Sequence, residues 1–172
     1  MERTVRRVHR LCQPDPEVLV KPSIEQSART THIIAAAIAA SVPIYMVVAW
    51  LVAPTVAAAA DNDELVPLLA GILAVLSAGH LVLAQLLFLS RVRAAAQLPT
   101  PEQRLAAYRV AVIIAFALRE AVAIYGLVLG FLSGDPRWAF GFGSVALVSM
   151  VFGWPRGSTM GRLASEVPSI GV

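Results

Sequence analysis

Long apolar stretches separated by short polar segments make up most of the chain. Four of them cover about residues 33–56, 66–89, 105–132 and 138–154. A hydrocarbon core about 30 Å thick needs about 20 apolar helical residues to cross it. The stretches show no two-residue alternation, and backbone groups in lipid must be paired within their own segment. The pattern therefore predicts an all-α integral membrane four-helix bundle, with residues 31–155 as its transmembrane domain.

Polar segments flank this domain on both sides. The N-terminal arm, residues 1–30, contains Pro14, Pro16 and Pro22, and we expect little regular structure in it. A C-terminal tail of residues 156–172 follows the last apolar stretch. Only 15% of the residues are charged and 58% are hydrophobic, whereas soluble domains contain about 25% charged residues. The composition therefore agrees with a membrane protein.

Basic residues are distributed unequally between the two sides of the predicted bundle. The first loop contains acidic residues and no basic one, and the third loop has a single base, Arg137. The arm, the second loop and the tail carry twelve bases: Arg3, Arg6, Arg7, Arg10, Lys21, Arg29, Arg91, Arg93, Arg104, Arg109, Arg156 and Arg162. The positive-inside rule then places both termini in the cytoplasm. The preference for arginine and alanine is typical of high-GC bacteria, so we expect a multi-pass protein of the inner (cytoplasmic) membrane.

Residues around the third stretch mark where its helix begins and ends. Thr100 followed by Pro101 is typical of a helix start, with Thr100 as N-cap and proline at the first helical position. Gly134, Asp135 and Pro136 predict a tight turn before the fourth stretch. The third and fourth helices should therefore be an antiparallel pair.

Arg119 and Glu120 lie near the middle of the third stretch, where charged side chains are rare. A charge at the centre of a membrane helix costs about 2.5–3.5 kcal/mol on the insertion scale, so both groups should face protein or water. Counting inward along each helix at 1.5 Å per residue places His80 of the second stretch and Tyr45 of the first at a similar depth. The sequence therefore predicts a polar cluster at mid-membrane, without establishing contacts within it.

Three interpretations of this cluster stay open. In the first, Arg119 and Glu120 belong to a buried ion pair and hydrogen-bond cluster that fixes the packing of the helices. In the second, Glu120, Arg119 and His80 form a proton-handling or ligand-binding site. In the third, His80 ligates a haem or pigment metal, as single membrane histidines can. The sequence does not identify a particular cofactor.

A segment of the third stretch resembles a known membrane family. Ala117-Leu118-Arg119-Glu120-Ala121-Val122-Ala123-Ile124-Tyr125-Gly126-Leu127-Val128 is similar to the carboxylate helix of the c subunit of rotary ATP synthases, and Pro101-Glu102-Gln103 is similar to the polar turn of that family. The resemblance covers residues 97–134. It implies a helix that runs outward from a cytoplasmic loop, with Glu120 as the carboxylate that binds a proton or sodium ion.

The sequence lacks the common signatures of soluble chemistry. We find no Gly-rich phosphate loop, no His-Glu-x-x-His site and no nucleophile elbow. Cys12 and His9 are only two potential ligands, which falls short of the four that a structural zinc site requires. We therefore expect no catalytic residue, no metal and no nucleic-acid partner.

The leading hypothesis is a non-enzymatic accessory or structural subunit of a larger inner-membrane complex. Its expected partners are the lipid bilayer and other membrane subunits, or further copies of the chain. The alternatives are a proton- or ion-translocating element that uses Glu120, and a pigment- or haem-binding subunit that uses His80.

Overall fold

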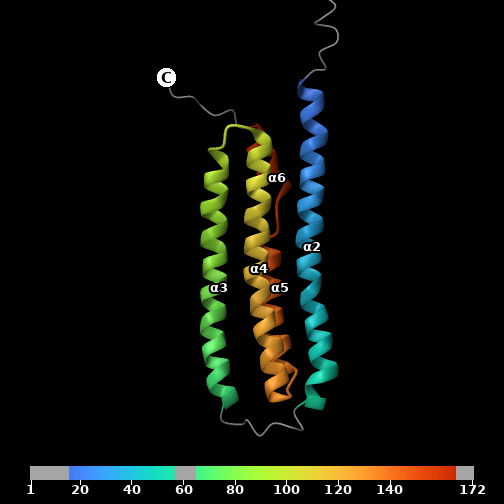
Figure 1. Cartoon of the computed structure of the whole chain (residues 1–172), viewed down its shortest axis with the longest axis vertical. Helices are drawn as coiled ribbons and strands as arrows, with labels where there is room; N and C mark the ends of the chain where they lie inside the picture. Colours follow the sequence, from blue (N-terminus) through green and yellow to red (C-terminus); the bar gives the residue numbers. More distant parts are fainter. Residues whose placement is uncertain (1–15, 57–64, 166–172) are drawn as a thin grey trace, which may run out of the picture.

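A computed structural model describes residues 16–56 and 65–165, with side chains described from residue 25 onward. These ranges are all-α. The helices are α2 (Pro16–Val56), α3 (Leu65–Ala96), α4 (Pro101–Ser133), α5 (Arg137–Phe152) and α6 (Gly157–Ser165). Figure 1 shows α2, α3, α4 and α5 aligned along one axis, with α4 between α2 and α3 and with α5 beside α4.

Three of these helices are long and apolar enough to cross a membrane: Glu25–Thr55, Leu65–Ala96 and Pro101–Ser133. This confirms the predicted all-α class and indicates a membrane protein. The fourth predicted stretch, residues 138–154, does not form a helix of this length. Helix α5 has 16 residues, or about 24 Å at 1.5 Å per residue. It is long enough to cross a membrane only together with α6, from which it is bent by 41°.

Helix α2 begins earlier than the sequence predicted. We expected little regular structure before residue 30, but α2 starts at Pro16. Proline is well tolerated in the first turn of a helix, and extending an existing helix costs much less than starting one. The extension also contacts the bundle, because Arg109 Nη2 donates a hydrogen bond of 2.9 Å to Ser27 Oγ.

Both ends of α4 follow the predicted signals. The Thr100 side chain accepts a hydrogen bond of 3.3 Å from the backbone N–H of Gln103, and Pro101 is the first helical residue. Gly134 ends the helix with φ 66°, a left-handed conformation that glycine adopts without strain. The chain then reverses into α5, so the predicted antiparallel pair is confirmed.

Helix α3 packs against α4 through small side chains spaced seven residues apart. Ala70, Ser77 and Ala84 are buried, and a seven-residue repeat keeps them on the same side of a helix that supercoils slightly around its neighbour. Small residues allow membrane helices to approach closely. Many of the large apolar side chains of α3 point outward: Val75, for example, is 74% exposed.

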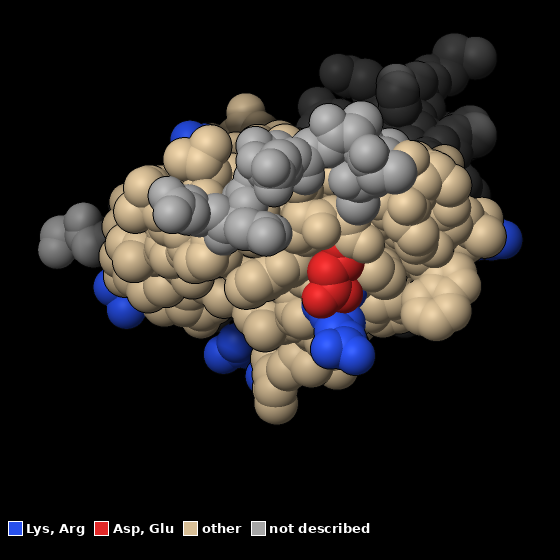
Figure 2. Space-filling model, turned by 90° about the horizontal axis from the view of Figure 1, so that it is seen from below, with Lys and Arg blue, Asp and Glu red and all other residues tan. Residues whose placement is uncertain are grey.

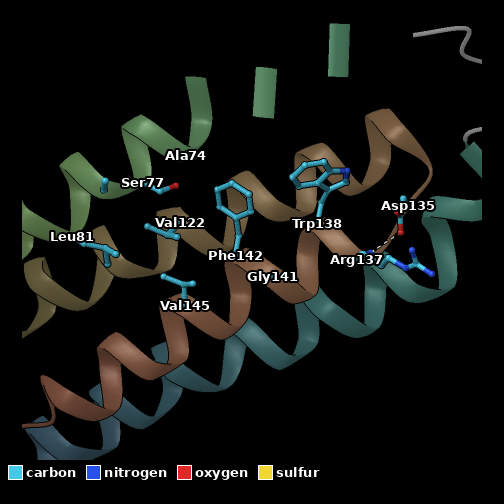
Figure 3. A pocket seen from close by; sticks show the side chains of 11 residues that line it. Ala74, Ser77, Leu81, Val122, Asp135, Arg137, Trp138, Gly141, Phe142 and Val145 are labelled. Carbon is cyan, nitrogen blue, oxygen red and sulfur yellow. Dashed lines mark hydrogen bonds between the residues drawn. The ribbon is translucent and has the colours of Figure 1, made fainter. Parts of the chain in front are cut away.

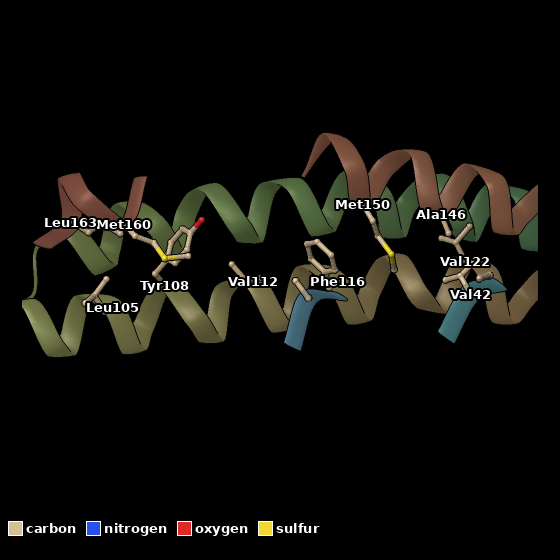
Figure 4. Close-up of a cluster of buried hydrophobic side chains, with 12 residues drawn as sticks. Val42, Leu105, Tyr108, Val112, Phe116, Val122, Ala146, Met150, Met160 and Leu163 are labelled. Carbon is tan, nitrogen blue, oxygen red and sulfur yellow. The ribbon is translucent and has the colours of Figure 1, made fainter. Parts of the chain in front are cut away.

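The buried core is elongated and follows α4. Figure 4 shows it from Leu105 and Tyr108 at one end to Val122 at the other. Helix α6 closes the first end, where Met160 and Leu163 pack against the core. There Arg104 is 1% exposed, and its guanidinium donates to the backbone carbonyls of Leu98 and Leu163. Arg104, which the sequence indicated only as a topology determinant, therefore also anchors α6.

Candidate functional site

Arg119 and Glu120 are consecutive residues of α4, and their side chains contact different helices. Neighbouring side chains on a helix diverge by about 100°. Glu120 points toward α2, where it meets Ser41 and Tyr45. Arg119 points toward α3 and the end of α5, where it meets Gln85 and Gly153. The two charged groups thus belong to two separate environments.

The Glu120 carboxylate is held by hydroxyl groups. Its Oε1 atom lies at hydrogen-bonding distance from two hydroxyl oxygens, 2.6 Å from Ser41 Oγ and 2.7 Å from Tyr45 Oη. Ser41 Oγ also lies 2.6 Å from the Ile38 carbonyl oxygen of its own helix. Glu120, Ser41 and Tyr45 are all partly buried, so the site sits at the α2–α4 interface and is not sealed from its surroundings.

Ser41 and Tyr45 meet Glu120 together because of helix geometry. Residues four positions apart lie on the same face of a helix, and both side chains can therefore reach one carboxylate across the α2–α4 interface. The sequence placed Tyr45 at the right depth, but Ser41 carries no charge and was not among the predicted site residues. Its spacing from Tyr45 was a signal that could have identified it.

Arg119 is buried, with 5% of its side chain exposed. Its Nη2 atom donates a hydrogen bond of 3.4 Å to Gln85 Oε1. The guanidinium carbon lies 5.7 Å from the centre of the Phe116 ring, a distance at which a cation is attracted to the face of an aromatic ring. The amide and the ring replace part of the hydration that an arginine loses in the membrane interior.

Gly153 makes room for the Arg119 guanidinium. A Cβ atom added at Gly153 would overlap Nη1, Cζ and Nη2 of Arg119. Gly153 directly follows α5, where the last carbonyl groups of the helix create a partial negative charge. The cation is therefore placed at the end of α5 that attracts it. The sequence marked Arg119 but had no signal for Gly153 or Gln85 as its neighbours.

His80 lies outside both environments. Its Nδ1 atom is 2.8 Å from the carbonyl oxygen of Leu76 on the same helix. Its ring packs edge-to-face with that of Tyr125, with 5.6 Å between the centroids. Of the four residues predicted to form one mid-membrane cluster, the structure brings only Tyr45 and Glu120 into hydrogen-bonding contact.

The first interpretation combined a buried ion pair with a hydrogen-bond cluster, and the described residues show the hydrogen bonds without an ion pair. Arg119 and Glu120 do not bond each other, and neither has an oppositely charged partner among the described residues. The reason is their adjacent position on α4, which directs them to different neighbours. Within residues 16–56 and 65–165, no group of three metal-ligating side chains is assembled either.

Comparison of the chain with protein families, with curated proteins and with solved structures found no match.

Proposed function

We propose that this chain is a multi-pass protein of the bacterial inner membrane in which Glu120 binds and releases a proton. The observation that carries the proposal is the surroundings of Glu120: a carboxylate halfway along a membrane helix, contacted by two hydroxyl groups and by no cation of the described residues. A charged carboxylate with such partners is costly in hydrocarbon. A bound proton removes that cost.

Hydrogen-bond counting supports a protonated Glu120. Ser41 has one hydroxyl hydrogen but lies at bonding distance from two oxygens, the Ile38 carbonyl and Glu120 Oε1. An ionised carboxylate only accepts, so one of these contacts would lack a hydrogen. A proton on Glu120 Oε1 supplies it: Glu120 donates to Ser41, Ser41 donates to Ile38, and the Tyr45 hydroxyl donates to Glu120. All three contacts are then hydrogen bonds.

The separation of Arg119 from Glu120 supports the same proposal. A guanidinium bonded to Glu120 would favour the ionised carboxylate and oppose proton binding. Arg119 instead bonds Gln85 and packs against Gly153. The resemblance of residues 97–134 to the c subunit of rotary ATP synthases also fits, since it implies that Glu120 is the ion-binding carboxylate.

The proposed topology has four spans, with α2, α3 and α4 as continuous helices and with α5 and α6 as one bent fourth span. The basic arm and the second loop are then cytoplasmic, and the chain leaves the membrane after α6 on the same side. The break between α5 and α6 lies beside Arg119, and its Pro155 is buried; non-helical backbone at membrane depth is tolerated where protein covers it. Reporter fusions at the second and third loops test this orientation, and a periplasmic second loop contradicts it.

Infrared spectroscopy of the purified chain in lipid tests proton binding. We expect a carbonyl band of a protonated carboxyl that disappears as the pH is raised and is missing in Glu120→Gln. Glu102→Gln is the matched control, because Glu102 is an exposed residue in the first turn of the same helix. A spectrum without a titrating band, or the same band in Glu120→Gln, refutes the proposal.

Proton flux into liposomes distinguishes binding from transport. If the chain conducts protons alone, the Glu120→Gln variant loses the flux and Glu102→Gln keeps it. If the infrared band titrates without any flux, Glu120 binds a proton but needs a partner to pass it on.

A second candidate is a structural or accessory subunit of a larger membrane complex. It is favoured by α3, whose large apolar side chains, such as Val75 and Leu68, remain uncovered by the described chain. Purification in mild detergent from its native membrane tests it. Co-purifying membrane subunits in fixed stoichiometry support this role, and a partner-free monomer counts against it.

A further inference from the structure

An open groove runs between α3 and α5 and is separate from the Glu120 site. It encloses about 700 Å³, which is within the range of about 300–1,000 Å³ found for small-molecule sites. One wall is formed by Ala74, Ser77, Ala78 and Leu81 of α3, and Val122 of α4 forms the floor. Its size and open side allow a ligand to enter laterally from the membrane.

The opposite wall of the groove is aromatic. Figure 3 shows the Trp138 and Phe142 side chains on α5 directed toward α3, with Gly141 between them and Val145 farther along. A Cβ atom added at Gly141 meets nothing within 4 Å, so the groove has open space at this position. The small and aromatic lining is suited to a hydrocarbon chain.

The mouth of the groove carries two charges of opposite sign. Asp135 and Arg137 line it at the turn between α4 and α5, and Figure 2 shows acidic and basic side chains next to each other at this end of the bundle. Asp135 Oδ1 accepts a hydrogen bond of 2.9 Å from the backbone N–H of Arg137. This hydrogen bond uses the backbone of Arg137. The Arg137 side chain is exposed and does not bond the Asp135 carboxylate.

The dimensions match one leaflet of a bilayer. From Arg137 to Val145 the groove follows α5 for eight residues, or about 12 Å at 1.5 Å per residue. Half of a hydrocarbon core of about 30 Å is close to this length. Its charged mouth therefore lies where lipid headgroups are found, and its apolar part lies where acyl chains are found.

We propose that the groove between α3 and α5 binds a zwitterionic phospholipid with a primary amine, such as phosphatidylethanolamine. An acyl chain lies against Trp138 and Phe142. The phosphate pairs with Arg137, and the ammonium group donates hydrogen bonds to Asp135. A primary amine fits better than a choline group, which has no N–H to donate, and better than an uncharged headgroup, which leaves Asp135 without a cation.

Native mass spectrometry of the purified full chain tests this site, using phosphatidylethanolamine, phosphatidylcholine and phosphatidylglycerol with the same acyl chains. We expect phosphatidylethanolamine to be retained about tenfold more strongly than the other two, as one charge-assisted hydrogen bond allows. Asp135→Asn should reduce its retention to that of phosphatidylcholine. Arg137→Gln should weaken the retention of both phosphatidylethanolamine and phosphatidylcholine. Equal retention of the three lipids by the parent chain overturns the proposal.

Filling the groove provides the second arm of the test. Gly141→Leu should abolish selective retention, whereas Gly71→Leu should not, since position 71 also has open space around it but does not line the groove. Ala78→Leu fills the groove from the opposite wall and should repeat the loss if Gly141→Leu does not fold. Retention unchanged by both groove-filling changes overturns the proposal. The proposal is also overturned if the parent chain is a dimer without bound lipid and Gly141→Leu dissociates it, because a second copy of the chain then occupies the groove.

Discussion

The two sides of α4 surround a charged residue with different groups and bury it to different degrees. On the side facing α2, Glu120 is half-buried and bonded by the flexible hydroxyls of Ser41 and Tyr45. On the side facing α3 and α5, Arg119 is 95% buried and enclosed by Gln85, Phe116 and Gly153. Both lie at the same depth on the same helix.

This difference separates a site that can change its charge from one that cannot. Arginine stays protonated in proteins, so its surroundings need only hold a permanent cation in place. A carboxyl can be neutral or charged, and hydroxyl groups both donate and accept hydrogen bonds. The Arg119 side therefore holds a permanent cation at the end of α5, and the Glu120 side is the one for which we propose proton binding.

The largest expected effect comes from removing the space around Arg119. Gly153→Val places side-chain atoms where the guanidinium lies, and overpacking of this kind costs about 1–3 kcal/mol. The guanidinium is the end of a flexible side chain and can move aside, but it then loses its contacts with Gln85 and Phe116, so we expect a loss within that range in detergent unfolding titrations. Gly157→Val is the control, because a Cβ atom there meets nothing within 4 Å. Equal stability of the two variants would show that Arg119 is not enclosed as described.

A smaller effect is expected on the other side of α4. Glu120→Leu removes the hydrogen-bond partner of the Tyr45 hydroxyl and one of the two partners of the Ser41 hydroxyl. Losing such bonds costs about 1 kcal/mol. Glu120→Gln keeps an acceptor oxygen and should unfold close to the parent in the same titration. A Glu120→Leu variant more stable than Glu120→Gln contradicts the proposed role of these bonds.

Tyr45→Phe should have a still smaller effect, because it removes one hydroxyl and leaves the ring in place. Hydrogen bonds between membrane helices contribute about 0.6 kcal/mol on average, and the loss should be of this size. Thr55→Val is the comparison on the same helix, since among the described residues its hydroxyl bonds only the Val52 carbonyl of α2 itself. A larger loss for Thr55→Val would count against the α2–α4 contact.

The smallest expected effect is the coupling free energy between the two sides of α4. If the environments of Arg119 and Glu120 are independent, the Gly153→Val and Glu120→Leu losses should add to within about 0.5 kcal/mol. A double-variant unfolding titration measures this directly. A coupling well above that value would show that the two sides of α4 respond to each other.

Much of the architecture was predictable because membrane spans follow simple rules of length and apolarity. The three long helices, the Thr100 cap and the Gly134 turn each have a local physical cause that is visible in the sequence. The start of α2 was predicted wrongly, because prolines were taken to end helical structure and Pro16 instead begins it. The depth of Tyr45 and Glu120 could be counted along each helix, since every residue adds a fixed rise.

By itself, the sequence determined that these helices are apolar, where most of them end, and that Arg119 and Glu120 lie at mid-helix. It could not determine which helix each side chain would face, because that depends on how α2, α3 and α5 rotate around α4. Tertiary packing decided that Glu120 meets two hydroxyls, that Arg119 fills the space beside Gly153, and that His80 joins neither. The reason is geometric: depth is set along one helix, whereas contact requires two helices to present the right faces to each other.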